Sequence, residues 1–239
     1  MQKIFLVTGA TKGIGLAISQ RLSDNGHVVI GVARHAANDP FPGQLFLADL
    51  SDQTAIEQVF KKIKDQYELD GIINNVGSEI PGRIEEINMA DFHEVMNSNL
   101  QTALQAMQIF VKGMMEKHWG RVVNISSRAS LGQDDRSVYA AAKAGLIAFT
   151  RSWALELAKT GVTVNAVAPG PIDTGRYRGF RPVGSEAEKK SIASVPMGRI
   201  GKPSEVAATV EFLLSEDAGF ITGQTIYVDG GGSIGRTTV

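Results

Sequence analysis

The amino-acid sequence predicts an α/β fold in which helices cover both faces of a parallel sheet of about seven strands. Short apolar runs alternate along the chain with longer amphipathic stretches, which is typical of repeated strand–helix–strand units. The short runs are almost continuously apolar, as expected for strands that are buried on both faces. The length of 239 residues suits one domain with a large core. We therefore expect a single doubly wound domain over residues 1–239.

The expected strands are apolar runs bounded by glycine or polar residues. In order along the chain they are residues 4–8, 28–32, 45–48, 71–74, 121–126, 163–168 and 225–228. Gly26 suits the end of a helix that begins near Gly13, and Ser51 can cap the next helix. Pro203 can open a later helix that runs to Ser215.

Composition excludes several classes of function. The chain has 24 basic and 25 acidic residues, so we expect no general attraction to nucleic acid or to anionic membranes. It has no cysteine, which excludes disulfides, thiolate metal sites and thiol nucleophiles. The apolar stretch at the N-terminus is too short for a signal peptide or a membrane span. We expect a cytoplasmic protein whose redox chemistry, if any, comes from a cofactor.

The histidines give no sign of a metal site. They are His27, His35, His93 and His118. They are isolated from one another and lack a ligand-like arrangement with carboxylates, which favours surface positions. We expect no metal.

A glycine-rich segment, residues 8–15, lies between the first expected strand and the first expected helix. In this place backbone amides and the helix N-terminus face a pyrophosphate. Three residues separate Gly9 from Gly13, with Gly15 following, which differs from the G-x-G-x-x-G spacing of other dinucleotide folds. The segment predicts a dinucleotide site, and the alternative is an ordinary glycine-rich turn.

The end of the second strand favours NADP(H) over NAD(H). An acidic residue there holds a ribose 2′-hydroxyl, whereas a basic residue accommodates a 2′-phosphate. Ala33 leaves the acidic position uncharged and Arg34 follows it, while Lys12 can approach from the glycine-rich segment. The alternative is that both cations are solvated surface charges.

Tyr139 and Lys143 are four residues apart, so on a helix they lie one turn apart on one face. An adjacent ammonium, together with an oxidised nicotinamide, would stabilise the tyrosine phenolate and let it exchange a proton with a substrate oxygen. Two serines at the carboxyl end of the fifth strand could hold a substrate carbonyl there. Strand alternation sends them to opposite faces, and we favour Ser127 over Ser126.

Together these residues resemble the short-chain dehydrogenase/reductase family over nearly the whole chain, from Thr8 to residues 228–231. The glycine-rich segment matches the cofactor loop of the family, and Tyr139-x-x-x-Lys143 matches its catalytic pair. Asn-Asn-Val-Gly at 74–77 matches its Asn-Asn-Ala-Gly segment, with valine in place of the usual alanine.

The resemblance implies a Rossmann-type domain with a catalytic tetrad of Asn99, Ser127, Tyr139 and Lys143. Asn99 would bind through its backbone a water in a proton relay to Tyr139. The implied cofactor contacts are Gly9, Thr11, Lys12, Gly13, Ile14, Gly15, Arg34, Asp49, Leu50, Asn75, Gly77, Tyr139, Lys143, Pro169, Gly170, Ile172 and Thr174. Of these, Asp49 and Leu50 would contact adenine, Asn75 the adenosine ribose, and residues 169–174 the nicotinamide carboxamide. A homotetramer packed through long helices is also implied, and the alanine-rich run 140–154 allows close helix packing.

Residues 175–196 lack clear periodicity and are too long for an ordinary connector, which predicts a lid or a mobile substrate loop. The segment carries three arginines, Arg176, Arg178 and Arg181. Because arginine pairs well with phosphate and carboxylate, we expect them to meet an anionic substrate or a phosphopantetheine-bearing partner. Tyr177 and Phe180 would add apolar contact. The alternative is a solvated or subunit-contacting loop.

Within the family, residues 113–117, 120–124 and 221–224 resemble 3-oxoacyl-[acyl carrier protein] reductases. The favoured activity is therefore the NADPH-dependent reduction of a 3-oxoacyl thioester, as in fatty acid biosynthesis. One alternative is an enzyme of the same architecture that acts on a sugar, polyol, steroid or small hydroxy acid. Another is a non-catalytic dinucleotide sensor, which the presence of all four tetrad residues disfavours.

Overall fold

The computed structural model describes residues 1–235 and contains one parallel sheet of seven strands, ordered β3-β2-β1-β4-β5-β6-β7. The strands are β1 Ile4–Thr8, β2 Val28–Ala33, β3 Gln44–Leu47, β4 Gly71–Asn74, β5 Gly120–Ile125, β6 Val162–Pro169 and β7 Thr225–Val228. Every predicted strand overlaps an observed one. The predicted fold class is confirmed.

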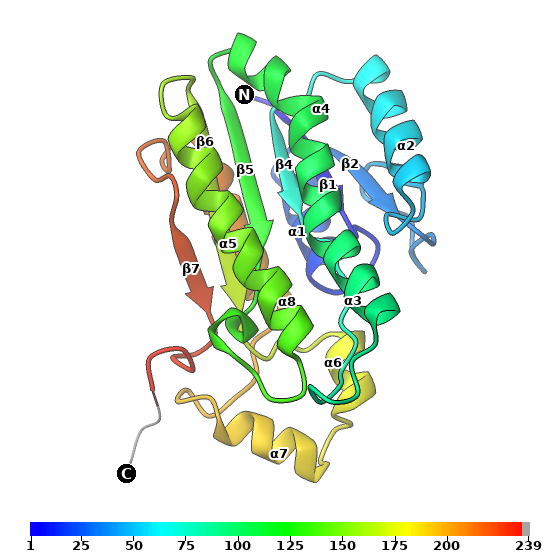
Figure 1. Ribbon diagram of the computed structural model, residues 1–239. Helices are drawn as coiled ribbons and strands as arrows, with labels where there is room; N and C mark the ends of the chain where they lie inside the picture. Colours follow the sequence, from blue (N-terminus) through cyan, green and yellow to red (C-terminus); the bar gives the residue numbers. More distant parts are fainter. Residues whose placement is uncertain (236–239) are drawn as a thin grey trace.

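Helices cover both faces of this sheet (Figure 1). They are α1 Gly13–Asp24, α2 Gln53–Gln66, α3 Met89–Met96, α4 Thr102–Glu116, α5 Ser137–Leu157, α6 Gly175–Phe180, α7 Glu186–Ala193 and α8 Pro203–Leu214, with the single turns η1 Asn97–Gln101 and η2 Arg128–Leu131. In Figure 1, α2, α4 and α5 lie in front of the sheet, and α1 and α8 lie behind it. None of the helices in the described residues is long and apolar enough to cross a membrane.

Two apolar clusters, one on each face, hold the layers together. Phe60 of α2, Phe110 of α4 and Trp153 of α5 belong to the front cluster. Ile18 of α1 and Val210 of α8 belong to the rear cluster. Because the sheet is buried on both sides, its polar loops are confined to its ends.

The strand order reverses between β1 and β4, since the chain first winds outward to β2 and β3 and then returns to the other side of β1. At such a switch point the loops that leave two neighbouring strands diverge and open a crevice at their carboxyl ends. The glycine-rich segment follows β1 and residues 75–77 follow β4. Both predicted cofactor segments therefore lie at this crevice.

The expected helix boundaries are confirmed at Gly26, which follows α1 with a positive φ of 80°, and at Pro203, the first residue of α8. The expected Ser51 cap is wrong. Asp52 caps α2 instead, because its carboxylate accepts a hydrogen bond of 2.9 Å from the Ala55 amide. Ser51 donates to the Asp49 carboxylate from both its amide and its hydroxyl.

Residues 175–196 contain two short helices that the sequence did not predict, and the expected role of this segment as a lid or mobile substrate loop stays a prediction. The helices are α6 and α7, each too short to show a clear apolar period. The Thr174 hydroxyl caps α6 by accepting from the Tyr177 amide, and the Ser185 hydroxyl caps α7 by accepting from the Glu188 amide. Figure 1 shows both helices, in yellow, at the end of the sheet toward which the strand arrows point.

Candidate active site

The glycine-rich segment forms a cradle that side chains would fill. Gly9 and Gly13 have φ angles of 66° and 55°, in the left-handed region that favours glycine. A Cβ on Gly15 would lie 2.2 Å from the Gly9 carbonyl oxygen. No side chain caps α1, whose N-cap is Lys12, so its first amides are available to an anion. The cradle therefore fits a dinucleotide pyrophosphate.

Hydrogen bonds from the end of β4 fix the shape of this cradle. The Thr8 hydroxyl accepts from the amides of Asn75 and Val76, at 3.0 and 3.1 Å. The side-chain amide of Asn75 donates to the carbonyls of Thr8 and Gly9, at 2.9 and 3.2 Å. Asn75 was expected at the adenosine ribose, and the structure places its amide against the cradle backbone.

The predicted adenosine contacts lie beyond the ends of β2 and β3. The Arg34 side chain is 62% exposed, and its guanidinium lies 3.9 Å from the Asp49 carboxylate. The hydrogen bond from the Ser51 amide is the largest cause that lowers the pKa of Asp49. The Leu50 side chain packs in the front cluster, and its carbonyl accepts a hydrogen bond of 2.8 Å from Thr102. The Leu50 side chain therefore belongs to the core.

The structure brings Tyr139, Lys143 and Ser127 together. Both Tyr139 and Lys143 lie on α5, with the Lys143 ammonium nitrogen 5.7 Å from the Tyr139 ring centroid. Lys143 is buried and donates a hydrogen bond of 2.8 Å to the Ile125 carbonyl. Ser127 hydrogen-bonds Tyr139, whereas Ser126 turns to the opposite side and donates to the Lys143 carbonyl. Ser127 is thus the serine that faces the tyrosine.

Asn99 lies in η1, a single π-helical turn between α3 and α4. Its side-chain amide donates to the carbonyls of Val95 and Ser78, at 2.8 and 2.9 Å, and its carbonyl oxygen is buried without a partner in residues 1–235. A Cβ on Gly77 would lie 2.3 Å from that oxygen and 3.3 Å from the Lys143 ammonium. Gly77 thus allows Asn99 and Lys143 to approach the same point. Sequence reasoning missed the π turn, although such turns often mark functional sites.

Burial sets the protonation of the two α5 groups. The pKa of Lys143 is lowered to about 7, mainly by burial and secondly by the cation of Arg176. Burial also raises the pKa of Tyr139, the carboxylate of Glu79 adds to this rise, and the hydrogen bond with Ser127 opposes it. In the chain's own groups desolvation therefore dominates both pKa values. The expected stabilisation of the Tyr139 phenolate by Lys143 together with an oxidised nicotinamide stays a prediction. Tyr139 is held as a phenol, which can donate a proton.

The three arginines of the expected substrate loop have different surroundings. Arg176 donates a hydrogen bond of 2.7 Å to the Gly77 carbonyl, beside the predicted tetrad. Arg178 pairs with the carboxylates of Asp173 and Glu188, which neutralise its charge within the loop. The Arg181 guanidinium lies 5.2 Å from the ring centroid of the buried Tyr177. Arg176 is the arginine that reaches the site.

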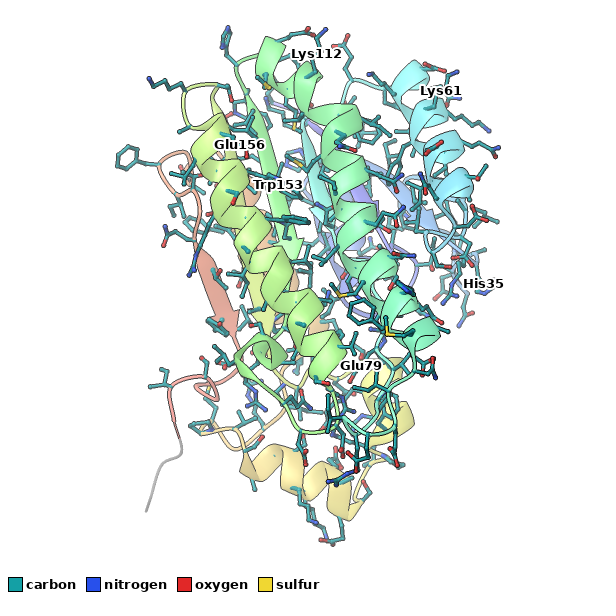
Figure 2. The ribbon with its side chains drawn as sticks, viewed as in Figure 1. His35, Lys61, Glu79, Lys112, Trp153 and Glu156 are labelled. Carbon is teal, nitrogen blue, oxygen red and sulfur yellow. The ribbon has the colours of Figure 1, made fainter. Side chains whose placement is uncertain are left out.

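Sequence reasoning missed a largely buried ion pair close to Tyr139. Glu79 lies in the loop after β4, Arg136 directly precedes α5, and their side chains are 14% and 12% exposed. Figure 2 labels Glu79 near the first turn of α5. The two residues are 57 positions apart in the sequence, and neither belongs to a motif that could have identified them.

Comparison with known proteins agrees with this geometry. The family described as enoyl-(acyl carrier protein) reductase matches residues 9–233. The 3-oxoacyl-[acyl-carrier-protein] reductase of Vibrio cholerae is 37% identical over 238 residues, covering 96% of each chain. The solved aldohexose dehydrogenase of Thermoplasma acidophilum is 35% identical with a TM-score of 0.89, over 100% of this chain and 96% of that one.

A second solved structure, YwfH, is described as an NADPH dependent reductase involved in bacilysin biosynthesis. It is 28% identical with a TM-score of 0.89, over 97% of this chain and 98% of that one. The match to the family extends from the cradle to the segment after β7. It includes the Tyr139–Lys143 pair on α5. The chain therefore belongs to the short-chain dehydrogenase/reductase family.

Proposed function

We propose that this chain is an NADPH-dependent reductase that converts a ketone to a secondary alcohol, with a 3-oxoacyl thioester as the favoured substrate. The observation that carries the proposal is the meeting of Tyr139 and Ser127 at the same end of the sheet as the glycine cradle. That arrangement puts a proton donor and a hydroxyl at the crevice where a dinucleotide fits.

Each tetrad residue has a distinct role in this proposal. The Ser127 hydroxyl orients the substrate oxygen, and the Tyr139 phenol donates its proton to that oxygen. NADPH, when bound, supplies the hydride. Lys143, with a pKa of about 7, can pass a proton back to Tyr139 near neutral pH. Asn99 completes the relay from the π turn that brings it toward Lys143.

The proposed cofactor site crosses the carboxyl ends of the strands, with Arg34 after β2 at one end and Thr174 after β6 at the other. Arg34 and Lys12 would hold the 2′-phosphate, and the amides of the cradle the pyrophosphate. A Cβ on Gly13 would lie 3.2 Å from the Thr174 methyl group, so the segment after β6 borders the cradle. The remaining proposed contacts are Gly9, Thr11, Ile14, Gly15, Asp49, Leu50, Asn75, Gly77, Tyr139, Lys143, Pro169, Gly170 and Ile172. The NADPH dependence of the similar YwfH supports this cofactor.

The favoured substrate is bound to a carrier. The similar Vibrio cholerae protein is a reductase of 3-oxoacyl-[acyl-carrier-protein], and Arg176 brings the arginine-bearing segment 175–196 beside the proposed tetrad, which suits an anionic substrate or carrier. A second candidate is an NADP-dependent dehydrogenase of a sugar, which the similarity to the Thermoplasma acidophilum aldohexose dehydrogenase favours.

The proposed setting is a single cytoplasmic domain that assembles as a homotetramer and binds neither nucleic acid nor membrane. The near-balance of 24 basic and 25 acidic residues supports the last point. Helices α4 and α5 lie together on one face (Figure 1), and Leu155 of α5 is 81% exposed. Burial of such apolar side chains favours association through these helices.

A substrate panel distinguishes the two candidate functions. Purified protein is mixed with NADPH or NADH and an acetoacetyl thioester, and cofactor oxidation is followed by absorbance. In parallel, NADP⁺ or NAD⁺ reduction is followed with aldohexoses and polyols. We expect the highest kcat/KM for NADPH with the thioester. A higher kcat/KM for an aldohexose would replace the thioester with a sugar substrate.

A further inference from the structure

The ion pair of Glu79 and Arg136 joins two segments that frame the active site. Glu79 is two residues beyond Gly77, and Arg136 is three residues before Tyr139. The two segments are also joined by backbone, because the Gly82 amide donates a hydrogen bond of 2.8 Å to the Asp135 carbonyl. The loop after β4 is therefore anchored to the start of the helix that carries the tyrosine.

The third segment at this place is α6. The Arg136 guanidinium lies 5.8 Å from the ring centroid of Phe180, at the end of α6. Arg176, at its start, donates to the Gly77 carbonyl. Glu79 and Arg136 are thus enclosed by three segments, which agrees with exposed fractions of 14% and 12%. Solvent and salt screen charges in such surroundings much less than they screen exposed charges.

Of the two partners, Glu79 has the larger electrostatic effect on Tyr139. Glu79 raises the pKa of both Tyr139 and Lys143, whereas Arg136 opposes it at Tyr139 with a smaller effect. The charged groups that face Tyr139 are therefore Glu79 from the loop after β4, Arg136 before α5, Lys143 on α5 and Arg176 from α6. Glu79 is the acidic group among these four, and its effect on the pKa of Tyr139 opposes that of Arg136 and Arg176.

We infer that Glu79 is a positioning residue that, held by Arg136, fixes the first turn of α5 and keeps Tyr139 as a proton-donating phenol. This favours reduction over oxidation. The protonation of Tyr139 is a property of the chain itself. The preference for reduction over oxidation rests on the proposed function.

The direction follows from the proton balance of the reaction. In reduction, the carbonyl carbon gains a hydride from NADPH, and the π electrons of its C=O bond move to oxygen. That oxygen takes the proton of Tyr139, whose O–H bond breaks and leaves a phenolate. In oxidation, the tyrosine must begin as the phenolate and accept the alcohol proton. A carboxylate near Tyr139 disfavours the phenolate and so disfavours oxidation near neutral pH.

Replacement of each partner tests the inference, with the ionisation of Tyr139 read directly. The chain has four tyrosines, and the difference between each protein and its Tyr139→Phe counterpart isolates the tyrosinate absorbance of Tyr139. We expect Glu79→Gln to move this titration to lower pH and Arg136→Gln to move it to higher pH. A merely structural role predicts the same direction for both, because either change would loosen the start of α5 and admit water.

Glu85 provides the matched control. It lies in the same loop, 61% exposed and paired with Arg83, and Glu85→Gln should leave the titration of Tyr139 unchanged. An unchanged or upward titration in Glu79→Gln would overturn the inference, as would a downward one in Arg136→Gln. If Glu79→Gln does not fold, the sign of the shift in Arg136→Gln decides. If Arg136→Gln does not fold, Glu79→Asp decides, because it keeps the charge and should leave the titration nearer to wild type than Glu79→Gln does.

Activity separates the inference from the proposed function. In Glu79→Gln, the ratio of alcohol oxidation to ketone reduction at neutral pH should rise. If the wild-type protein reduces no carbonyl while the titrations move as expected, the proposed function fails and the charge assignment stands.

Discussion

Gly15 shows at a single residue why the cradle depends on glycine. A Cβ there would lie 2.2 Å from the Gly9 carbonyl oxygen and 2.6 Å from the Asn75 side-chain nitrogen. Gly15→Ala must therefore displace the start of α1 and should abolish NADPH binding, measured by fluorescence titration. Gly113 in α4 is the control, since a Cβ there meets no atom within 4 Å, and Gly113→Ala should stabilise the fold by about 1 kcal/mol. Wild-type affinity in Gly15→Ala would contradict the assignment of the cradle.

Arg34 carries the proposed preference for NADPH. A hydrogen bond to a charged group contributes about 1.5–3 kcal/mol, so Arg34→Ala should lower kcat/KM for NADPH by about tenfold or more. The value for NADH should hardly change. Arg83 has a similar exposed fraction, 63% against 62%, and Arg83→Ala should alter neither value. Equal losses with NADPH and NADH in Arg34→Ala would show that this arginine does not read the 2′-phosphate.

At the scale of the element, α6 and α7 depend on Arg178. Its guanidinium joins Asp173, before α6, to Glu188 of α7. Arg178→Ala should therefore increase proteolytic cleavage within residues 175–196, as checked by limited trypsin digestion and mass spectrometry. Because the side chain is partly exposed, overall stability should change little. Arg199→Ala, which removes an ion pair at the start of α8, should leave cleavage within that segment unchanged.

The elements differ in how well the sequence predicts them. The buried strands could be predicted because short, continuous apolar runs are typical of strands that a parallel sheet buries on both faces. The cap of α2 was harder, since Ser51 and Asp52 are both good caps, and the contact with the Ala55 amide decides between them. The π turn at Asn99 gives no local signal, because it depends on tertiary contacts with Ser78 and Val95.

The candidate site shows the same division. Tyr139 and Lys143 could be predicted because their spacing places them on one helical face. The choice of Ser127 over Ser126 needed the direction of each side chain. Glu79 and Arg136 lie far apart in the sequence, and only the folded chain brings them together.

At the scale of the whole molecule, Lys143 should make the stability of the fold depend on pH. Its pKa is about 7 when folded and 10.5 as the ordinary value. Between these pH values the unfolded chain binds a proton that the folded chain has released, so stability rises with pH. Below about pH 7 the cost of burying the ammonium is fully present. Relative to Lys143→Met, the wild-type free energy of unfolding should therefore increase from pH 7 to pH 10, measured by urea denaturation of the protein without cofactor. A flat difference would contradict the burial of this lysine.

The central claim is that Tyr139 donates the proton in an NADPH-dependent ketone reduction, and Tyr139→Phe tests it most directly. The change removes one oxygen atom and keeps the ring. NADPH oxidation with an acetoacetyl thioester should lose about 10²–10⁴-fold in kcat/KM, the range of a general acid. NADPH affinity, measured by fluorescence titration, should change little. Wild-type turnover in this variant, with the cofactor bound normally, would contradict the account.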